Sequence, residues 1–139
     1  MPRLTILLIL LSGFSLISCN GPGYQTSLER TVWVVSEFGN RRDTLNRPIT
    51  MTFEDGHVRG SAGCNSYGGE YRIAGDRISF EDIFATMMAC PELEGIMERE
   101  QEFLQFLAGV ETYRFSEDRL LLFHSDGEMI VFTPHDSME

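Results

Sequence analysis

The stretch that decides the fold lies at residues 48–62 and reads PITMTFEDGHVRGSA. Its apolar side chains at positions 49, 51 and 53 alternate with threonines, which is the period-two pattern of a half-buried β-strand. Glu54-Asp55-Gly56 has the composition of a tight hairpin turn, because the glycine can adopt a positive φ. Residues 57–62 are therefore predicted to pair back as a second strand, with Gly60 at a bulge or a close backbone approach.

Further strands of the same kind are predicted on both sides of this hairpin. Each is rich in β-branched or aromatic residues and is bounded by short turns containing Gly, Asp or Ser. These strands are expected at residues 28–38, 65–73, 77–80, 112–115, 119–123 and 129–132, with a charged loop at 39–47. Consecutive strands joined by short turns indicate an antiparallel meander.

The hydrophobic period changes at residues 91–107, which predicts the one helix of the chain. Its apolar side chains recur at helical spacing, Pro91 suits a first helical position, and Gly109 is a natural terminator. Carboxylates alternate through Glu98, Glu100 and Glu102, and we expect them to form a solvated face, not an acid–base pair. The predicted fold is α+β: a curved antiparallel β-sheet of about seven or eight strands with one main α-helix packed against it.

The N-terminal residues have the pattern of a sorting signal. Arg3 and the largely apolar run 4–17 match the length of a secretory signal core and are too short for a spanning helix. Leu16-Ile17-Ser18-Cys19 resembles the lipobox of bacterial lipoprotein precursors, which implies cleavage before Cys19 and lipidation of that residue. Residues 1–18 are then a signal peptide and 19–27 a lipidated tether. An ordinary signal peptide with an incidental cysteine is the alternative.

Residues 28–134 are predicted to form one domain, followed by a polar tail at 135–139. The chain has a net charge of −10 and all eleven of its Lys and Arg positions are arginine. An acidic body argues against binding to nucleic acid, since phosphate contacts need clustered positive charge. It also argues against the domain itself lying on an anionic lipid surface, so the membrane is expected to be reached through the lipid anchor.

With Cys19 assigned to lipid, Cys64 and Cys90 remain. Two thiols in an oxidising compartment most often form a disulfide, which here would stabilise the domain by about 3–4 kcal/mol in the chain-entropy model. A free, reactive or metal-binding pair stays open as the alternative.

Two segments, Gly60–Tyr71 (GSAGCNSYGGEY) and Ala85–Glu92 (ATMMACPE), together resemble the META domain family of HslJ-like heat-shock lipoproteins. The resemblance covers nearly all of the chain after the tether. It implies a small envelope protein linked to stress tolerance, with no general enzymatic activity attached to the family.

Cysteine catalysis and Cu(I) binding have weaker support in the sequence. His57 or His124 could serve a nucleophilic Cys90, yet nothing in the sequence places a histidine beside that thiol. Met87 and Met88, with thiols, Met97 and His124, are ligand types that suit Cu(I), although methionine also fills irregular cores. We therefore predict no catalytic residue, no resident metal and no cofactor, and keep Cu(I) binding as the alternative function.

The most concrete binding hypothesis concerns Asn65, Tyr67 and Tyr71, which could form a recognition patch if the two tyrosines share an outward face. The sequence thus predicts a non-enzymatic lipoprotein of the bacterial cell envelope that binds an envelope protein or a small molecule. Asn20 in place of an inner-membrane retention aspartate favours the outer membrane, facing the periplasm.

Overall fold

The structure, a computed structural model, describes residues 27–43 and 46–135, which form nine β-strands and one α-helix. The elements in chain order are β1 (Trp33–Phe38), β2 (Arg41–Arg42), β3 (Thr50–Glu54), β4 (His57–Ser61), β5 (Ser66–Ala74), β6 (Arg77–Ala85), α1 (Ile96–Leu107), β7 (Val110–Ser116), β8 (Arg119–His124) and β9 (Met129–Pro134). The predicted signal peptide, Cys19 and the tether up to residue 26 lie outside the described residues.

No helix within these described ranges has both the length and the apolar character needed to span a bilayer.

The nine strands make one antiparallel sheet, and the prediction of a curved sheet is wrong, because the sheet is a closed barrel. Strands β1 and β3 to β9 follow one another in chain order, and β9 pairs back onto β1, so that the sheet closes into an eight-stranded barrel with β2 as an extra strand beside β1. The closing register sets Trp33 opposite Pro134, Val35 opposite Phe132 and Phe38 opposite Ile130.

Closure depends on pairing between the two ends of the domain, and this explains why the sequence did not reveal it. The alternation of apolar and polar residues is the same along a strand of an open sheet and a strand of a closed barrel. The hydroxyl of Ser36 donates to the carbonyl of Val131, 95 residues away, and no local pattern encodes such a partner.

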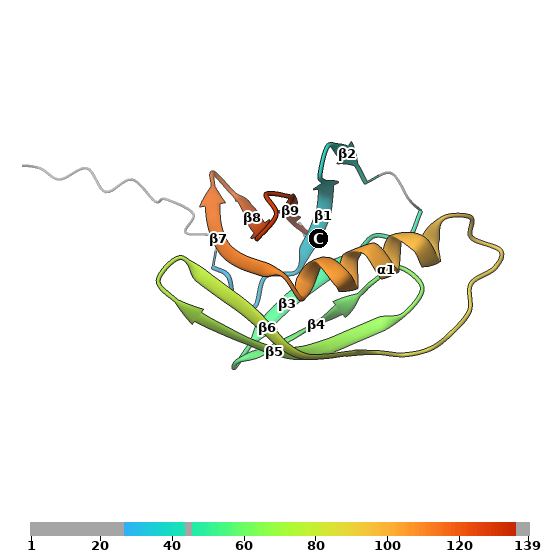
Figure 1. Ribbon diagram of the computed structural model, residues 1–139, viewed down its shortest axis with the longest axis horizontal. Helices are drawn as coiled ribbons and strands as arrows, with labels where there is room; N and C mark the ends of the chain where they lie inside the picture. The colour runs from blue at the N-terminus through green and yellow to red at the C-terminus, as the bar shows by residue number, and fades with distance from the viewer. Residues whose placement is uncertain (1–26, 44–45, 136–139) are drawn as a thin grey trace, which may run out of the picture.

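The barrel is least continuous between β6 and β7, where the register contains the single pair Arg77 and Thr112. The chain between these strands holds α1. In Figure 1 the helix lies beside β6, between the β3–β6 part of the sheet and the part formed by β7, β8, β9 and β1. The helix thus covers the opening that the diverging strands leave.

The helix begins at Ile96, five residues later than Pro91. Residues 90–95 instead form two short turns, in which the amide of Leu93 donates to the carbonyl of Cys90 and the amide of Ile96 donates to that of Leu93. Gly95 has φ +78°, a left-handed conformation through which a right-handed helix cannot continue. The predicted end is confirmed, since α1 stops at Leu107 and Gly109 follows.

The core lies inside the barrel and against the inner face of the helix. Its largest fully buried side chains come from seven elements and the segment before β3, and they include Trp33, Ile49, Phe53, Phe103, Leu120 and Phe132. Gly60 lies so close to the carbonyl of Thr50 that a Cβ there would overlap the β3 backbone. The predicted close approach at this glycine is therefore confirmed.

Candidate functional site

The two sequence segments that carry the family resemblance meet at one buried polar cluster. Asn65 follows the turn after β4, and its side chain accepts hydrogen bonds from the amide of Met88 (2.7 Å) and the hydroxyl of Thr86 (2.8 Å). Its Nδ2 donates to Oε1 of Glu100 at 2.6 Å, and its backbone amide donates to Oε2 of the same carboxylate at 2.6 Å. Asn65 therefore joins the barrel, the loop after β6 and the helix.

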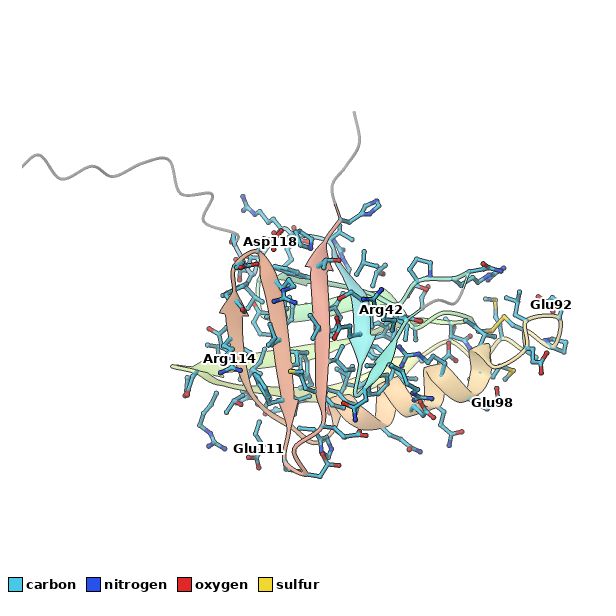
Figure 2. The ribbon with its side chains drawn as sticks, turned by 90° about the horizontal axis from the view of Figure 1, so that it is seen from above. Arg42, Glu92, Glu98, Glu111, Arg114 and Asp118 are labelled. Carbon is cyan, nitrogen blue, oxygen red and sulfur yellow. A yellow bond between two sulfur atoms is a disulfide. The ribbon has the colours of Figure 1, made fainter. Side chains whose placement is uncertain are left out.

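A disulfide between Cys64 and Cys90 lies next to this cluster. The two Cα atoms are 6.0 Å apart, and both residues are buried against Ile96 and Leu93. Figure 2 shows the sulfur–sulfur bond at the end of the molecule that carries Glu92. The predicted pairing is thus present, and it fixes the entry of the helix to the start of β5.

The tyrosines of the predicted patch point inwards. Tyr67 is buried, stacks edge-on against Phe103 and donates its hydroxyl to the carbonyl of Thr50 (2.9 Å). Burial raises the pKa of Tyr67 well above its usual value. Tyr71 packs against Phe53 and donates to Glu29 (2.7 Å). Asn65 is also buried, so in this structure the three residues form no exposed recognition surface.

The sulfur groups do not form the arrangement that the copper hypothesis requires. Met87 and Met88 are exposed, but Cys64 and Cys90 are bonded to each other and present no free thiolate. Met97 is partly exposed on the helix, and His124 lies at the far end of α1, beside Phe106. Within the described residues no group of three or more His, Cys, Asp or Glu side chains converges as a metal site.

The catalytic thiol hypothesis requires a free thiol at Cys90, whereas Cys90 is bonded to Cys64. His124 instead lies 2.7 Å from the Asp126 carboxylate, at the edge of a polar hollow that also contains Arg41 and Glu102. The hydrogen bond from the backbone amide of Glu128 lowers the pKa of Asp126, and the hydrogen bond with His124 lowers it further. The residues that line this hollow include no serine, threonine or cysteine, so the histidine has no nucleophile to activate there.

A groove of about 730 Å³ lies between β6 and α1. One wall contains Phe80 and residues 82–85 of β6. The other is a stripe at helical spacing along α1 and its C-cap residue, with Met97, Gln101, Leu104 and Ala108. Its volume lies within the range of ordinary ligand sites.

The groove is apolar on its floor and acidic at its rim. Phe84 and Met97 both line the groove and are 69% and 42% exposed. The charged side chains that line the groove are Asp82, Glu98 and Glu100, with no arginine or histidine among them. Glu100 is already bound to Asn65, so Asp82 and Glu98 supply the free negative charge.

A buried ion pair holds the other side of the helix. The guanidinium of Arg99 lies 3.3 Å from the Asp43 carboxylate and 4.4 Å above the ring of Phe38. Burial lowers the pKa of Arg99, and the charge of Asp43 opposes that shift. The helix wall of the groove is thus anchored at Asn65, at the disulfide and at this pair.

Sequence reasoning missed Glu100 and the groove. Glu100 was expected on a solvated face, yet it is 8% exposed. A signal was present, because Ile96, Glu100, Phe103 and Leu107 recur at spacings of four, three and four residues and all are buried. The groove had no comparable signal, because β6 and α1 meet only in the tertiary structure.

A family model described as the META domain matches residues 26–137. No curated protein matches the sequence.

Solved structures share the fold. An NMR structure of a protein from Burkholderia xenovorans aligns with a TM-score of 0.66 at 23% identity, covering 78% of this chain and 84% of that one. A crystal structure of a DUF4847 family protein from Bacteroides vulgatus aligns with a TM-score of 0.60 at 16% identity, covering 81% and 96%. At these identities the likeness concerns the fold.

Proposed function

This chain belongs to the META domain family, and from that premise we propose that it is a non-enzymatic lipoprotein of the bacterial envelope that binds a partner in the groove between β6 and α1. The partner-binding role is taken to support stress tolerance at the envelope. The observation that carries the proposal is the groove itself, because it combines exposed apolar side chains with an acidic rim on a fixed frame.

Two features support the envelope location. The Leu-Ile-Ser-Cys sequence ending at Cys19 has the form of a lipidation signal. The Cys64–Cys90 disulfide is of the kind that persists in an oxidising compartment. A lipid-anchored domain facing the periplasm from the outer membrane accounts for both features, and the two or more acyl chains of such an anchor hold a protein stably at a bilayer.

The location is tested by replacing Cys19 with serine in the full chain. We expect the wild type in the membrane fraction, with a mass shift from its acyl groups, and C19S as an unprocessed form without that shift. Sucrose-gradient separation of inner and outer membranes then assigns the membrane. If C19S is processed and retained like the wild type, the lipoprotein assignment is wrong.

The binding role is tested by photo-crosslinking in intact cells. A benzophenone amino acid is placed at Gln101, in the groove wall, and in a second strain at Asp118, in the turn between β7 and β8. We expect an adduct of one defined mass from position 101 alone, and its loss when Glu98 is changed to arginine. Equal adducts from both positions would contradict a groove site. Mass spectrometry of the adduct distinguishes a protein from a lipid or another small molecule.

Cu(I) binding is a second candidate, favoured by one observation. The carbonyl oxygen of Met88 lies 3.5 Å from the sulfur of Cys64, so reduction would free two thiols beside the segment that carries Met87 and Met88. Titration of the reduced and oxidised protein with Cu(I) tests it, with M87L as the matched variant. Stoichiometric binding by the reduced form that weakens in M87L would favour this candidate.

A further inference from the structure

Strand β6 has one edge without a partner along most of its length. One side of the strand pairs with β5 from Arg77 to Ala85, whereas the other pairs with β7 only through Arg77. Among the described residues, no further backbone hydrogen bond joins residues 79–85 to any element other than β5. The backbone N–H and C=O groups that point away from β5 are therefore available to another strand.

This free edge borders the groove. Phe80 and residues 82–85 of β6 form one wall, and the stripe of α1 that includes Gln101 and Leu104 forms the other. A space between a strand edge and a helix suits an extended polypeptide, which gains main-chain hydrogen bonds from the strand and side-chain contacts from the helix. A small apolar molecule would fill the floor but leave the backbone groups of β6 without protein partners.

Resting on the function proposed above, we propose that the occupant of the groove is an extended segment of a partner protein that adds to β6 as a further strand. Side chains of such a segment alternate between its two faces. Those on one face contact the apolar floor at Ile83, Met97 and Leu104. Those at the rim meet Asp82 and Glu98, and since the lining contains no basic side chain, the segment carries lysine or arginine at these positions.

A bulge in β6 limits the length of that pairing. Glu81 is opposite Glu70 and Phe84 is opposite Gly68, so Asp82 and Ile83 together face Gly69. Asp82 has φ +51°, and a Cβ at Gly69 would lie 2.8 Å from the carbonyl oxygen of Glu81. Bulges place particular side chains beside binding sites and interrupt long flat edges. The bulge therefore presents Asp82 at the groove and disfavours indefinite edge-to-edge association of the protein.

The experiment uses the full oxidised chain in detergent and three labelled, end-capped peptides of about eight residues, an ordinary strand length. In the first peptide valine alternates with lysine. In the second glutamate replaces lysine, and the third is the first with every backbone nitrogen methylated. Fluorescence anisotropy measures the Kd of each, and amide hydrogen exchange reports on residues 79–85.

The valine–lysine peptide is expected to bind saturably and to slow the exchange of amides in β6. The methylated peptide loses the donors for about three backbone bonds of about 1 kcal/mol each, which predicts an affinity weaker by about a hundredfold. The glutamate peptide is expected to bind at least about tenfold more weakly, because like charges meet at the rim. Equal affinity of the methylated peptide would overturn strand addition.

Position is tested with a matched pair of charge reversals. Figure 2 shows Glu98 on α1 and Asp118 at a turn on the other side of the molecule. Both are exposed carboxylates. E98R is expected to raise the Kd of the valine–lysine peptide by about threefold to tenfold, whereas D118R is expected to leave this Kd unchanged. Equal effects would place the peptide elsewhere and overturn the inference.

Two further outcomes separate this inference from the proposed function. If the photo-crosslink forms at position 101 but the valine–lysine peptide neither binds nor slows exchange in β6, strand addition is wrong and the groove remains a binding site. If both fail, the proposed function is wrong as well. Concentration-dependent dimerisation that excludes the peptide would assign the β6 edge to a second copy of the chain and overturn the partner segment.

Discussion

The amide group of Asn65 lies 2.6 Å from the carboxylate of Glu100, and the backbone amide of Asn65 binds the other oxygen of the same carboxylate at 2.6 Å. The two residues are 35 positions apart, and both are buried. One side chain of the helix thus satisfies two donors of the turn between β4 and β5. Because the helix forms one wall of the groove, this contact also sets the geometry of the candidate site.

Replacing Glu100 with alanine is expected to destabilise the domain by about 2–4 kcal/mol, because two buried donors of Asn65 lose their acceptor. Glu100→Gln keeps one acceptor oxygen and is expected to cost less. The matched control is Glu102→Ala on the exposed side of the same helix, where an ion pair with Arg41 contributes less than about 1 kcal/mol. Urea unfolding of the oxidised proteins measures all three, and equal losses for E100A and E102A would refute the assignment.

Removal of the disulfide is expected to lower the free energy of unfolding by about 3–4 kcal/mol, since Cys64 and Cys90 are separated by 26 residues. The measurement is thermal unfolding with and without reductant. A double alanine variant provides the control, because its transition should not respond to reductant. Thiol counting under denaturing, non-reducing conditions should find neither cysteine free in the wild type.

Replacing Arg99 with alanine is expected to cost about 3 kcal/mol, because it leaves the buried carboxylate of Asp43 without its guanidinium and exposes the ring of Phe38. Arg99→Lys retains the charge but loses the planar contact with the ring, so its free energy of unfolding should lie between those of the wild type and R99A. Arg41→Ala removes an exposed pair and should change stability by less than about 1 kcal/mol. Guanidinium unfolding compares the three variants with the wild type. If R99A is as stable as the wild type, the pair of Arg99 and Asp43 does not hold the helix.

Two apolar residues of α1 are expected to separate stability from binding. Phe103 is fully buried against Tyr67, and Phe103→Ala should cost about 3–5 kcal/mol. Met97 lies at the groove, and Met97→Ala should cost less than about 1 kcal/mol while weakening the valine–lysine peptide about threefold. Chemical unfolding and peptide titration of both variants check this, and a strongly destabilised M97A would show that Met97 belongs to the core.

Much of the local structure was accessible from the sequence. The hairpin at residues 48–62 was predicted because its alternation and its turn are properties of neighbouring residues. The predicted start of the helix was wrong, because Pro91 suits a first helical position whereas Gly95 has a left-handed conformation. Strand β6 is longer than expected, since residues 81–85 pair with β5 across a bulge that no alternation pattern anticipates.

The candidate site was harder to predict from the sequence than the local structure. Tyr67 and Tyr71 were considered as surface residues because aromatic side chains on a strand can face either way. The two residues are four positions apart on β5 and so share a face, and in the structure Tyr67 is buried while Tyr71 is half-buried against the core. Glu100 has the spacing of a core residue, but only the presence of Asn65 opposite it makes a buried carboxylate tolerable.

The sequence by itself determined the order of the strands, the one helix and the resemblance to a family, because each depends on local periodicity, turn chemistry or short motifs. It favoured a bond between Cys64 and Cys90 but left free thiols open, and the structure shows the bond. The tertiary structure alone decided that β9 returns to β1 and that β6 keeps a free edge beside α1. Both are pairings between distant segments, and the same alternating strands satisfy an open sheet or a closed barrel equally well. Which strand edge stays unpaired, and so which surface is available for binding, follows only from the way the whole sheet closes.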